Sequence, residues 1–204
     1  NRVPTDSTTQ GEWLLENNSA DDRKLASFNL TTGTESFGFY ADGYWRESND
    51  YEVPVEAEVK EDEHNEHEEH ETDNYTVANS AEKSTGFTLG TSYLFEEGYI
   101  GVAVEQFNRE YGVPGHSHGD ESVFADLEQT RVQLLGEYNL TNQFIKQLKL
   151  ASGFTDYQHS EVEGGQIGTL FENETQEIKL DVIHNIFYDW NGGISLHYKN
   201  SEMA

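Results

Sequence analysis

The chain has no cysteine, only 12 Lys and Arg against 39 Asp and Glu, and no long apolar run in its 204 residues. A protein outside the cytoplasm can lack thiols altogether. Any metal here must then be held by His, Asp, Glu or backbone oxygen. Without Lys/Arg clusters, nucleic acid is excluded as an expected partner, because phosphate binding requires them. No stretch approaches the roughly 20 apolar residues of a membrane-spanning helix, so a membrane would have to be crossed by a β-barrel.

The net charge of −27 predicts attraction of cations, although solubility or adaptation to a salty habitat explains it equally well. Strong acidity can also indicate disorder. The content of eleven Tyr, eleven Phe and three Trp argues against disorder. These aromatic residues recur in short alternating runs, which favours β structure.

Alternation of apolar and polar residues predicts about nine antiparallel strands. In 36–46, for example, Phe37, Phe39 and Trp45 share one face, with Tyr40 and Asp42 on the other. The runs that alternate in this way are 11–17, 23–32, 36–46, 86–95, 99–108, 131–140, 145–157, 177–184 and 193–199.

The connections are expected to alternate between short and long. Short ones are expected at 33–35, 96–98, 141–144 and 189–193, and long surface loops at about 47–84, 110–124 and 158–173. This asymmetry is typical of a transmembrane β-barrel, with a soluble β-sandwich as the alternative. Aromatics near strand ends are candidates for interfacial girdles: Trp13, Trp45, Tyr93, Phe95, Tyr99, Tyr138, Tyr157 and Trp190. An odd strand count, with no initiator Met before NRVPTDSTTQ, predicts that the chain is part of a longer protein.

The first histidine cluster lies in the acidic segment 56–73, where His64, His67 and His70 are spaced three apart. Imidazole and carboxylate together suit Zn²⁺ and related divalent ions. Because these positions would fan around a helix, a flexible loop that gathers two of them with a Glu is the better expectation. A solvated acidic loop with incidental histidines is the alternative.

The second cluster is GVPGHSHGDE at 112–121, which offers His116, His118, Asp120 and Glu121 as metal ligands. In an extended segment, positions 116, 118 and 120 project to the same side. Two imidazoles and one carboxylate make a three-ligand site with room for water or a fourth ligand. The alternative is a polar turn with chance histidines.

The remaining histidines give weaker signals. His159 is placed to join a metal site from the side, whereas His184 and His197 lie inside strands, where a lumen-facing or hydrogen-bonded role is expected. Calcium is compatible with so many carboxylates, but no EF-hand or repeat nonapeptide occurs. No nucleophile–base motif, phosphate-binding glycine loop or HExxH motif occurs either, so an enzyme is not expected.

Taken together, these segments resemble the zinc-uptake branch of the TonB-dependent outer-membrane receptors. The most specific pieces are REYGVPGHSH and YQHSEVEGGQIGTLFENET, which join a loop motif to its flanking strands. Further matching stretches are NRVP, GYWRESNDYEVP, FADLEQTRVQLLGEYNL and IKLDVIHN. NRVP resembles the junction that follows the plug domain, so the whole chain, 1–204, corresponds to the first nine or so strands of a 22-strand barrel.

The resemblance implies zinc import across the outer membrane of a Gram-negative bacterium, past a plug domain that contacts TonB. His116 and His118 resemble the histidine-bearing surface loop of this family, and His64, His67 and His70 lie in a His-rich insertion. The plug and the remaining strands, with any ligands they donate, are not in this sequence. A haem or metal-chelate receptor is the runner-up within transport, and a metal-stabilised surface adhesin or binding module is the alternative from a different class.

Overall fold

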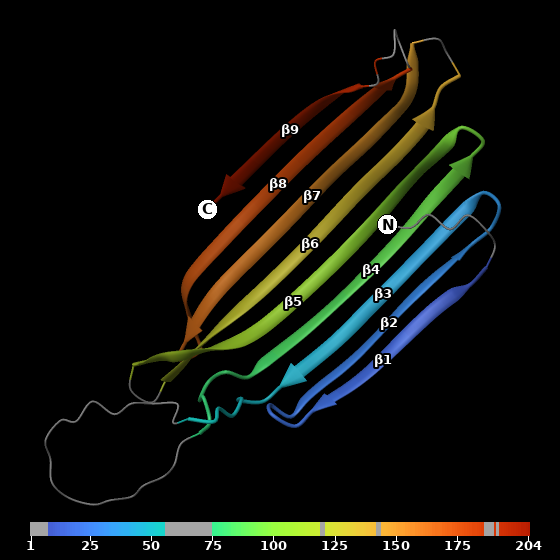
Figure 1. Ribbon diagram of the computed structural model, residues 1–204. Helices are drawn as coiled ribbons and strands as arrows, with labels where there is room; N and C mark the ends of the chain where they lie inside the picture. Colours follow the sequence, from blue (N-terminus) through green and yellow to red (C-terminus); the bar gives the residue numbers. More distant parts are fainter. Residues whose placement is uncertain (1–7, 56–74, 119–120, 142–143, 186–189, 191) are drawn as a thin grey trace, which may run out of the picture.

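The structure is a computed structural model that describes residues 8–55, 75–118, 121–141, 144–185, 190 and 192–204, with only the backbone described for 116–118 and 121. Nine antiparallel strands form one open sheet, in which each strand pairs with its neighbours in sequence (Figure 1). The strands are β1 (Gln10–Asn18), β2 (Arg23–Gly33), β3 (Phe37–Ser48), β4 (Glu82–Phe95), β5 (Gly98–His118), β6 (Glu121–Asn139), β7 (Ile145–Glu163), β8 (Gln166–His184) and β9 (Gly193–Met203). The described ranges contain no helix, so the expected all-β class and the nine antiparallel strands are confirmed.

Two of the three expected long loops are wrong. Residues 110–124 and 158–173 are mostly strand, because β5 runs to His118 before β6 starts at Glu121, and only Gly164 and Gly165 separate β7 from β8. These two glycines have φ values of 56° and 75°. Left-handed φ at both positions is what a two-residue hairpin turn requires. The third loop, expected at 47–84, corresponds to the connection 49–81 between β3 and β4.

The connections therefore divide the sheet into two ends, visible at opposite corners of Figure 1. We call the end with the β1–β2, β3–β4, β5–β6 and β7–β8 connections the loop end. The opposite end, with the other four connections, is the turn end. Strands β5 to β8 are 19 to 21 residues long, against 14 or fewer for the other five. The long strands extend past the rest at the loop end.

The register sorts the side chains onto two faces, because cross-strand partners point to the same side. We call one face the polar face. A single register row on it crosses the whole sheet through Glu12, Asn29, Asp42, Thr88, Glu105, Arg131, Thr155, Thr175 and Ser201. The ion pairs between described residues also lie on this face, for example Lys199–Glu177 at 3.1 Å.

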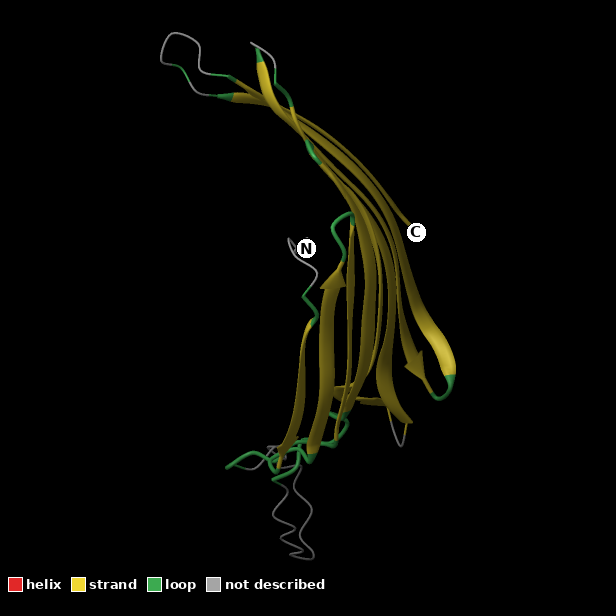
Figure 2. Ribbon diagram, turned by 90° about the vertical axis from the view of Figure 1, so that its right-hand side faces the viewer, coloured by secondary structure: helices red, strands yellow, loops and turns green. Residues whose placement is uncertain are grey.

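The other face, the apolar face, carries a band of large hydrophobic side chains across all nine strands. Its members include Trp13, Phe28, Phe39, Leu89, Val102, Leu134, Leu150, Leu180 and Leu196. Many are strongly exposed, among them Trp13 at 77% and Leu196 at 62%. Within the described residues, Ala125 is the one buried hydrophobic side chain. The sheet is a single curved layer, and no second sheet covers the apolar face in the described ranges, unlike in a β-sandwich (Figure 2).

The apolar band runs obliquely across the strands. A row of cross-strand partners begins in the middle of the band with Leu196, Leu180 and Leu150 on β9, β8 and β7. Followed to β3, the same row ends at Phe37, the first residue of β3, at the turn end of the sheet. A row that starts at Trp45 leaves the band at the other side, through Asn108, Glu128 and Gln158. The strands are therefore tilted with respect to the band.

Aromatic rings border the band at the turn end. The ring centroids of Phe37 and Tyr93 are 5.2 Å apart, and those of Tyr93 and Phe95, and of Phe95 and Tyr138, are each 6.0 Å apart. Three of the expected girdle residues, Tyr93, Phe95 and Tyr138, are thus neighbours on the apolar face. Two others are corrected: Tyr99 and Tyr157 lie on the polar face, because their strand positions alternate with those of the band.

Candidate functional site

A group of charged and aromatic side chains occupies the loop end of the polar face. Arg46 near the end of β3, Glu82 at the start of β4 and Arg109 in β5 meet there, because antiparallel pairing brings their strands side by side. Glu82 accepts hydrogen bonds from both guanidinium groups, one through each carboxylate oxygen. The bond from Arg109 Nη2 to Glu82 Oε2 is 2.9 Å long. Two cations share one carboxylate, which leaves a local positive charge in an otherwise acidic chain.

The environment of Glu82 alters its acidity. Partial burial alone would raise the pKa of Glu82, but the hydrogen bonds and positive charge of Arg46 and Arg109 outweigh it and hold the pKa below its usual value. Glu82 therefore stays ionised at neutral pH and keeps the ends of β3, β4 and β5 together.

The same group continues along the polar face as a set of rings. The Arg109 guanidinium lies 4.6 Å from the ring centroid of Tyr111, a cation–π arrangement. The His159 ring is surrounded by the rings of Tyr111, Tyr157 and Phe171, with centroids 6.4, 6.4 and 6.0 Å away. We call these residues the His159 group. They join β5, β7 and β8 over the smaller side chains of β6.

The imidazole of His159 has an unused hydrogen-bonding atom. Its Nε2 is shielded from solvent and has no hydrogen-bond partner among the described residues. An unsatisfied buried polar atom costs about 1–3 kcal/mol, so a partner that supplied a metal ion or an acceptor would recover that free energy. The sequence placed His159 beside a metal site; the structure places it in an aromatic group.

The second histidine cluster lies at the tip of the β5–β6 hairpin. His116 and His118 belong to the last residues of β5, and His118 pairs with Glu121, the first residue of β6. The pairing is interrupted between Gly112 and Ser117, and Gly115 has a φ of 76°. His116 and His118 therefore lie in a β-hairpin, and the long loop expected at 110–124 is corrected. Asp120 lies outside the described residues.

The first cluster, His64, His67 and His70, also lies outside the described residues, as part of 56–74. The ends of this connection are described, and they pair with each other. Glu52 bridges to Thr76, and the Val53 amide donates to the Tyr75 carbonyl at 2.8 Å. The remaining histidines are in strands, as expected: His197 faces Lys179 on the polar face, and Nδ1 of His184 lies 2.5 Å from the Asn185 carbonyl oxygen.

Where side chains are described, no three His, Asp or Glu converge in a way that would hold a metal ion. The zinc ligands expected from the sequence all fall outside that part, so they stay a prediction. The described ranges contain no helix that is long and apolar enough to cross a membrane. No protein-family model matches the chain.

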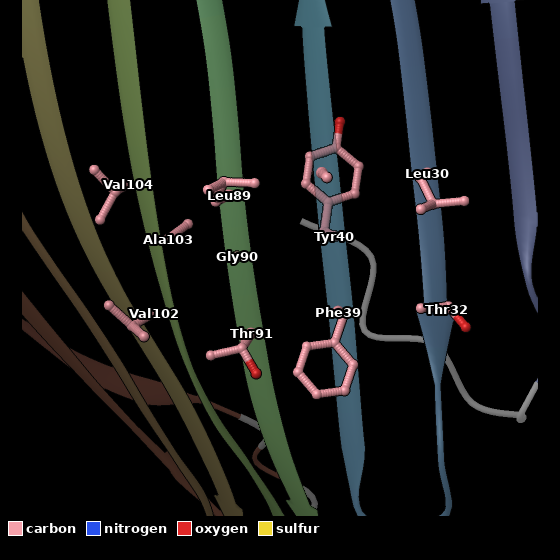
Figure 3. A pocket seen from close by; sticks show the side chains of 11 residues that line it. Leu30, Thr32, Phe39, Tyr40, Leu89, Gly90, Thr91, Val102, Ala103 and Val104 are labelled. Carbon is pink, nitrogen blue, oxygen red and sulfur yellow. The ribbon is translucent and has the colours of Figure 1, made fainter.

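The apolar face has a shallow hollow of about 350 Å³ over β2 to β5 (Figure 3). Leu30, Phe39, Leu89, Val102 and Val104 stand around it, and the small Ala41 leaves space between them. Its lining is mostly hydrocarbon, with hydroxyl groups from Thr32, Tyr40 and Thr91, and suits an alkyl chain.

Reasoning from the sequence missed the Arg46–Glu82–Arg109 group and the partners of His159. Arg46 and Glu82 are 36 residues apart in sequence, and only the strand register brings them together. The one available signal was that Arg46 stands at a polar position of the alternating run 36–46.

Proposed function

We propose that this chain forms part of an outer-membrane β-barrel that imports zinc or a similar divalent metal, with its apolar face against lipid. The observation that carries the proposal is the oblique apolar band. Strands of a closed barrel tilt by about 35–45°, so a lipid layer of constant thickness contacts successive strands at staggered positions. The stretch of β4 within the band, Phe87 to Phe95, is close to the roughly 9–11 residues that a tilted strand needs to span a bilayer.

The exposure of the band also favours lipid. Soluble monomers rarely expose a contiguous apolar patch larger than a few hundred Å². At about 25 cal/mol per Å² of apolar surface, leaving a nine-strand band in water would be a heavy free-energy cost. The aromatic border at the turn end matches the girdles that barrels place at a membrane interface, and the hollow beside Ala41 fits an acyl chain.

The loop end supplies the features for metal capture. Beyond the band, the apolar face continues as carboxylates, with Asp156, Glu174 and Glu202 in one register row. Such a field raises the local concentration of cations. His116, His118 and Glu121 at the hairpin tip, together with Asp120, His64, His67 and His70, would hold the ion. Passage inward would require the plug and the TonB contact that the resemblance implies.

Zinc titration into the intact protein in detergent micelles tests the proposal. We expect micromolar or tighter binding that weakens at least about tenfold in the His116→Ala/His118→Ala double variant. His197→Ala, on β9 away from the hairpin tip, is the matched control and should bind as the wild type does. Undiminished binding in the double variant would remove the hairpin histidines from the proposal. A protein that folds in water without detergent, and that zinc merely stabilises, would instead be the adhesin-like module.

One observation favours a second candidate, a receptor for haem or a related planar metal chelate. The His159 group combines an imidazole with a free Nε2, three flanking rings and the nearby Arg109. Imidazole ligates haem iron, rings stack on the macrocycle, and arginine pairs with its carboxylates. Haem titration should then shift the Soret band, and His159→Ala should abolish the shift, while an unchanged spectrum in the wild type would exclude this candidate.

A further inference from the structure

The base of the β5–β6 hairpin is fastened by a side chain from another part of the chain. Asn79, in the connection between β3 and β4, donates its side-chain amide to the carbonyls of Val113, at 3.0 Å, and Val123, at 2.6 Å. Val113 directly follows Gly112, the last residue of β5 that pairs with β6 before the register shift. Val123 lies opposite Val113 in β6. One amide group therefore bridges both strands of the hairpin.

The bridge lies where the ladder between the strands fails. Gly112 pairs with Phe124, and the next pair is Ser117 with Ser122, so four residues of β5 face one residue of β6. Carbonyls in such an irregularity lose their ladder partners, and an unsatisfied buried carbonyl is costly. The two hydrogen bonds of Asn79 replace ladder bonds at this point. The side-chain amide of Asn79 therefore connects β5 to β6 at the point where their backbone pairing is interrupted.

Asn79 is itself held in place. Its backbone amide donates to Asp50 Oδ2 at 3.2 Å, and Asp50 Oδ1 accepts the amides of Ser80, at 2.7 Å, and Ala81, at 2.8 Å. Asn79 has a φ of 59°, a left-handed conformation that Asn and Asp adopt more readily than other non-glycine residues. Asn79 is thus fixed by its backbone, with its amide free to bind the hairpin.

Gly112 allows the close approach. The Ala81 carbonyl accepts the Gly112 amide at 3.0 Å. A Cβ atom on Gly112 would lie 2.3 Å from the Asn79 carbonyl oxygen and 2.5 Å from its Oδ1. Either Asn79 or the hairpin would have to move, so a side chain at position 112 should loosen the bridge without touching the proposed metal ligands.

We propose that Asn79 is a positioning residue for metal capture, whose bridge to Val113 and Val123 fixes the hairpin that carries His116 and His118. This inference rests on the proposed function, because His116 and His118 are themselves proposed, not observed, as metal ligands. Preorganised ligands bind a metal more tightly than ligands that must be ordered on binding, and loss of an outer partner typically weakens metal affinity 10–100-fold.

The test compares Asn79→Asp with the wild type in the intact protein in micelles. Aspartate keeps the size and the left-handed preference of asparagine, but its carboxylate cannot donate to the two carbonyls. Asn173→Asp is the matched control, since it makes the same charge change in β8, where the asparagine amide contacts Ser201 instead. Gly112→Ala is a second variant that displaces Asn79 without altering its amide.

Two quantities are measured on each variant: the Zn²⁺ dissociation constant and the distance distribution between spin labels at Ser122→Cys and Gln176→Cys. The chain has no cysteine, so these are its only labelled sites. We expect Asn79→Asp and Gly112→Ala to broaden the distribution and to weaken Zn²⁺ binding about tenfold. Asn173→Asp should change neither quantity, and far-UV circular dichroism should be the same in all four proteins.

The outcomes separate this inference from the proposed function. Zn²⁺ binding that stays within about twofold of wild type in Asn79→Asp, while His116→Ala/His118→Ala loses it, overturns the positioning role and leaves the proposed function standing. Zn²⁺ binding that is absent from the wild type, or independent of His116 and His118, overturns the proposed function and the inference with it. A distribution unchanged in Asn79→Asp also overturns the inference, because the bridge would then not fix the hairpin.

Discussion

Phe37 and Tyr93 are direct cross-strand partners on the apolar face, with ring centroids 5.2 Å apart at the turn end of the sheet. Their side chains are 45% and 46% exposed. A tyrosine with an apolar body and a polar tip is favoured where hydrocarbon meets water. The pair therefore marks one border of the apolar band, and the band defines where the proposed membrane lies.

Charge introduced on the two faces should have unequal effects. Leu89 is 57% exposed in the middle of the band, and Thr88 is its neighbour on the polar face. If Leu89 contacts lipid, Leu89→Lys should lower the free energy of unfolding by about 2–4 kcal/mol in lipid vesicles, whereas Thr88→Lys should cost less than about 1 kcal/mol. Urea unfolding of vesicle-inserted protein, followed by tryptophan fluorescence, measures both. Equal small effects would mean that Leu89 faces water.

The Glu82 ion pairs should contribute stability that depends on pH. Because the pKa of Glu82 is lowered in the folded protein, its contribution is complete above the ordinary carboxyl pKa of 4.5 and is lost as the pH falls through the lowered value. Glu82→Gln should destabilise the protein by about 1 kcal/mol at neutral pH, because solvent screens the partly exposed arginine partners. Thermal melts of wild type and variant should converge in strong acid.

The matched control for Glu82 is Glu110→Gln, which removes a carboxylate from the other face of the adjacent strand β5. It should leave the thermal midpoint near that of the wild type. If the difference in thermal midpoint between the wild type and Glu82→Gln stays constant with pH, the contacts of Arg46 and Arg109 do not act through the charge of Glu82.

Zinc affinity should fall in acid if imidazole holds the ion. Histidine must be neutral to bind a metal, so affinity should decrease as the pH drops through about 6.5. A site of carboxylates alone would keep its affinity to about pH 5, because those groups stay ionised. Zinc titrations between these two values distinguish them, and a flat profile would rule out His116 and His118 as ligands.

Alternation alone was sufficient to predict the nine strands. A strand with one face in an apolar environment has an apolar residue at every second position, so its sequence alternates with a period of two. It failed at 110–124 and 158–173. There charged side chains lie on both faces of the sheet, as with Glu172 on one face and Glu161 on the other. Aromatic rings such as Phe171 lie on the polar face, so the period of two is lost although the strands continue. Histidine, glycine and carboxylates also have weak strand propensity, and the pairing with neighbouring strands overrides it.

The site was less predictable for a related reason. The contacts of Glu82 with Arg46 and of Asn79 with Val123 join residues 36 and 44 apart in sequence. Such contacts follow from the register and from a turn of the β3–β4 connection, neither of which has a local signature. The histidine clusters, by contrast, are visible in composition, but composition does not tell which of them meet.

The most direct test of the central claim, that one face of the sheet contacts lipid, uses single cysteines in this cysteine-free chain. An environment-sensitive fluorophore is attached at Leu89→Cys, Val104→Cys or Leu150→Cys on the apolar face, or at Thr88→Cys, Glu105→Cys or Lys149→Cys on the polar face, and the intact protein is inserted into vesicles with brominated acyl chains. We expect blue-shifted emission and strong quenching at the first three positions and neither at the other three. Equal, water-like emission without quenching at all six positions would contradict the account.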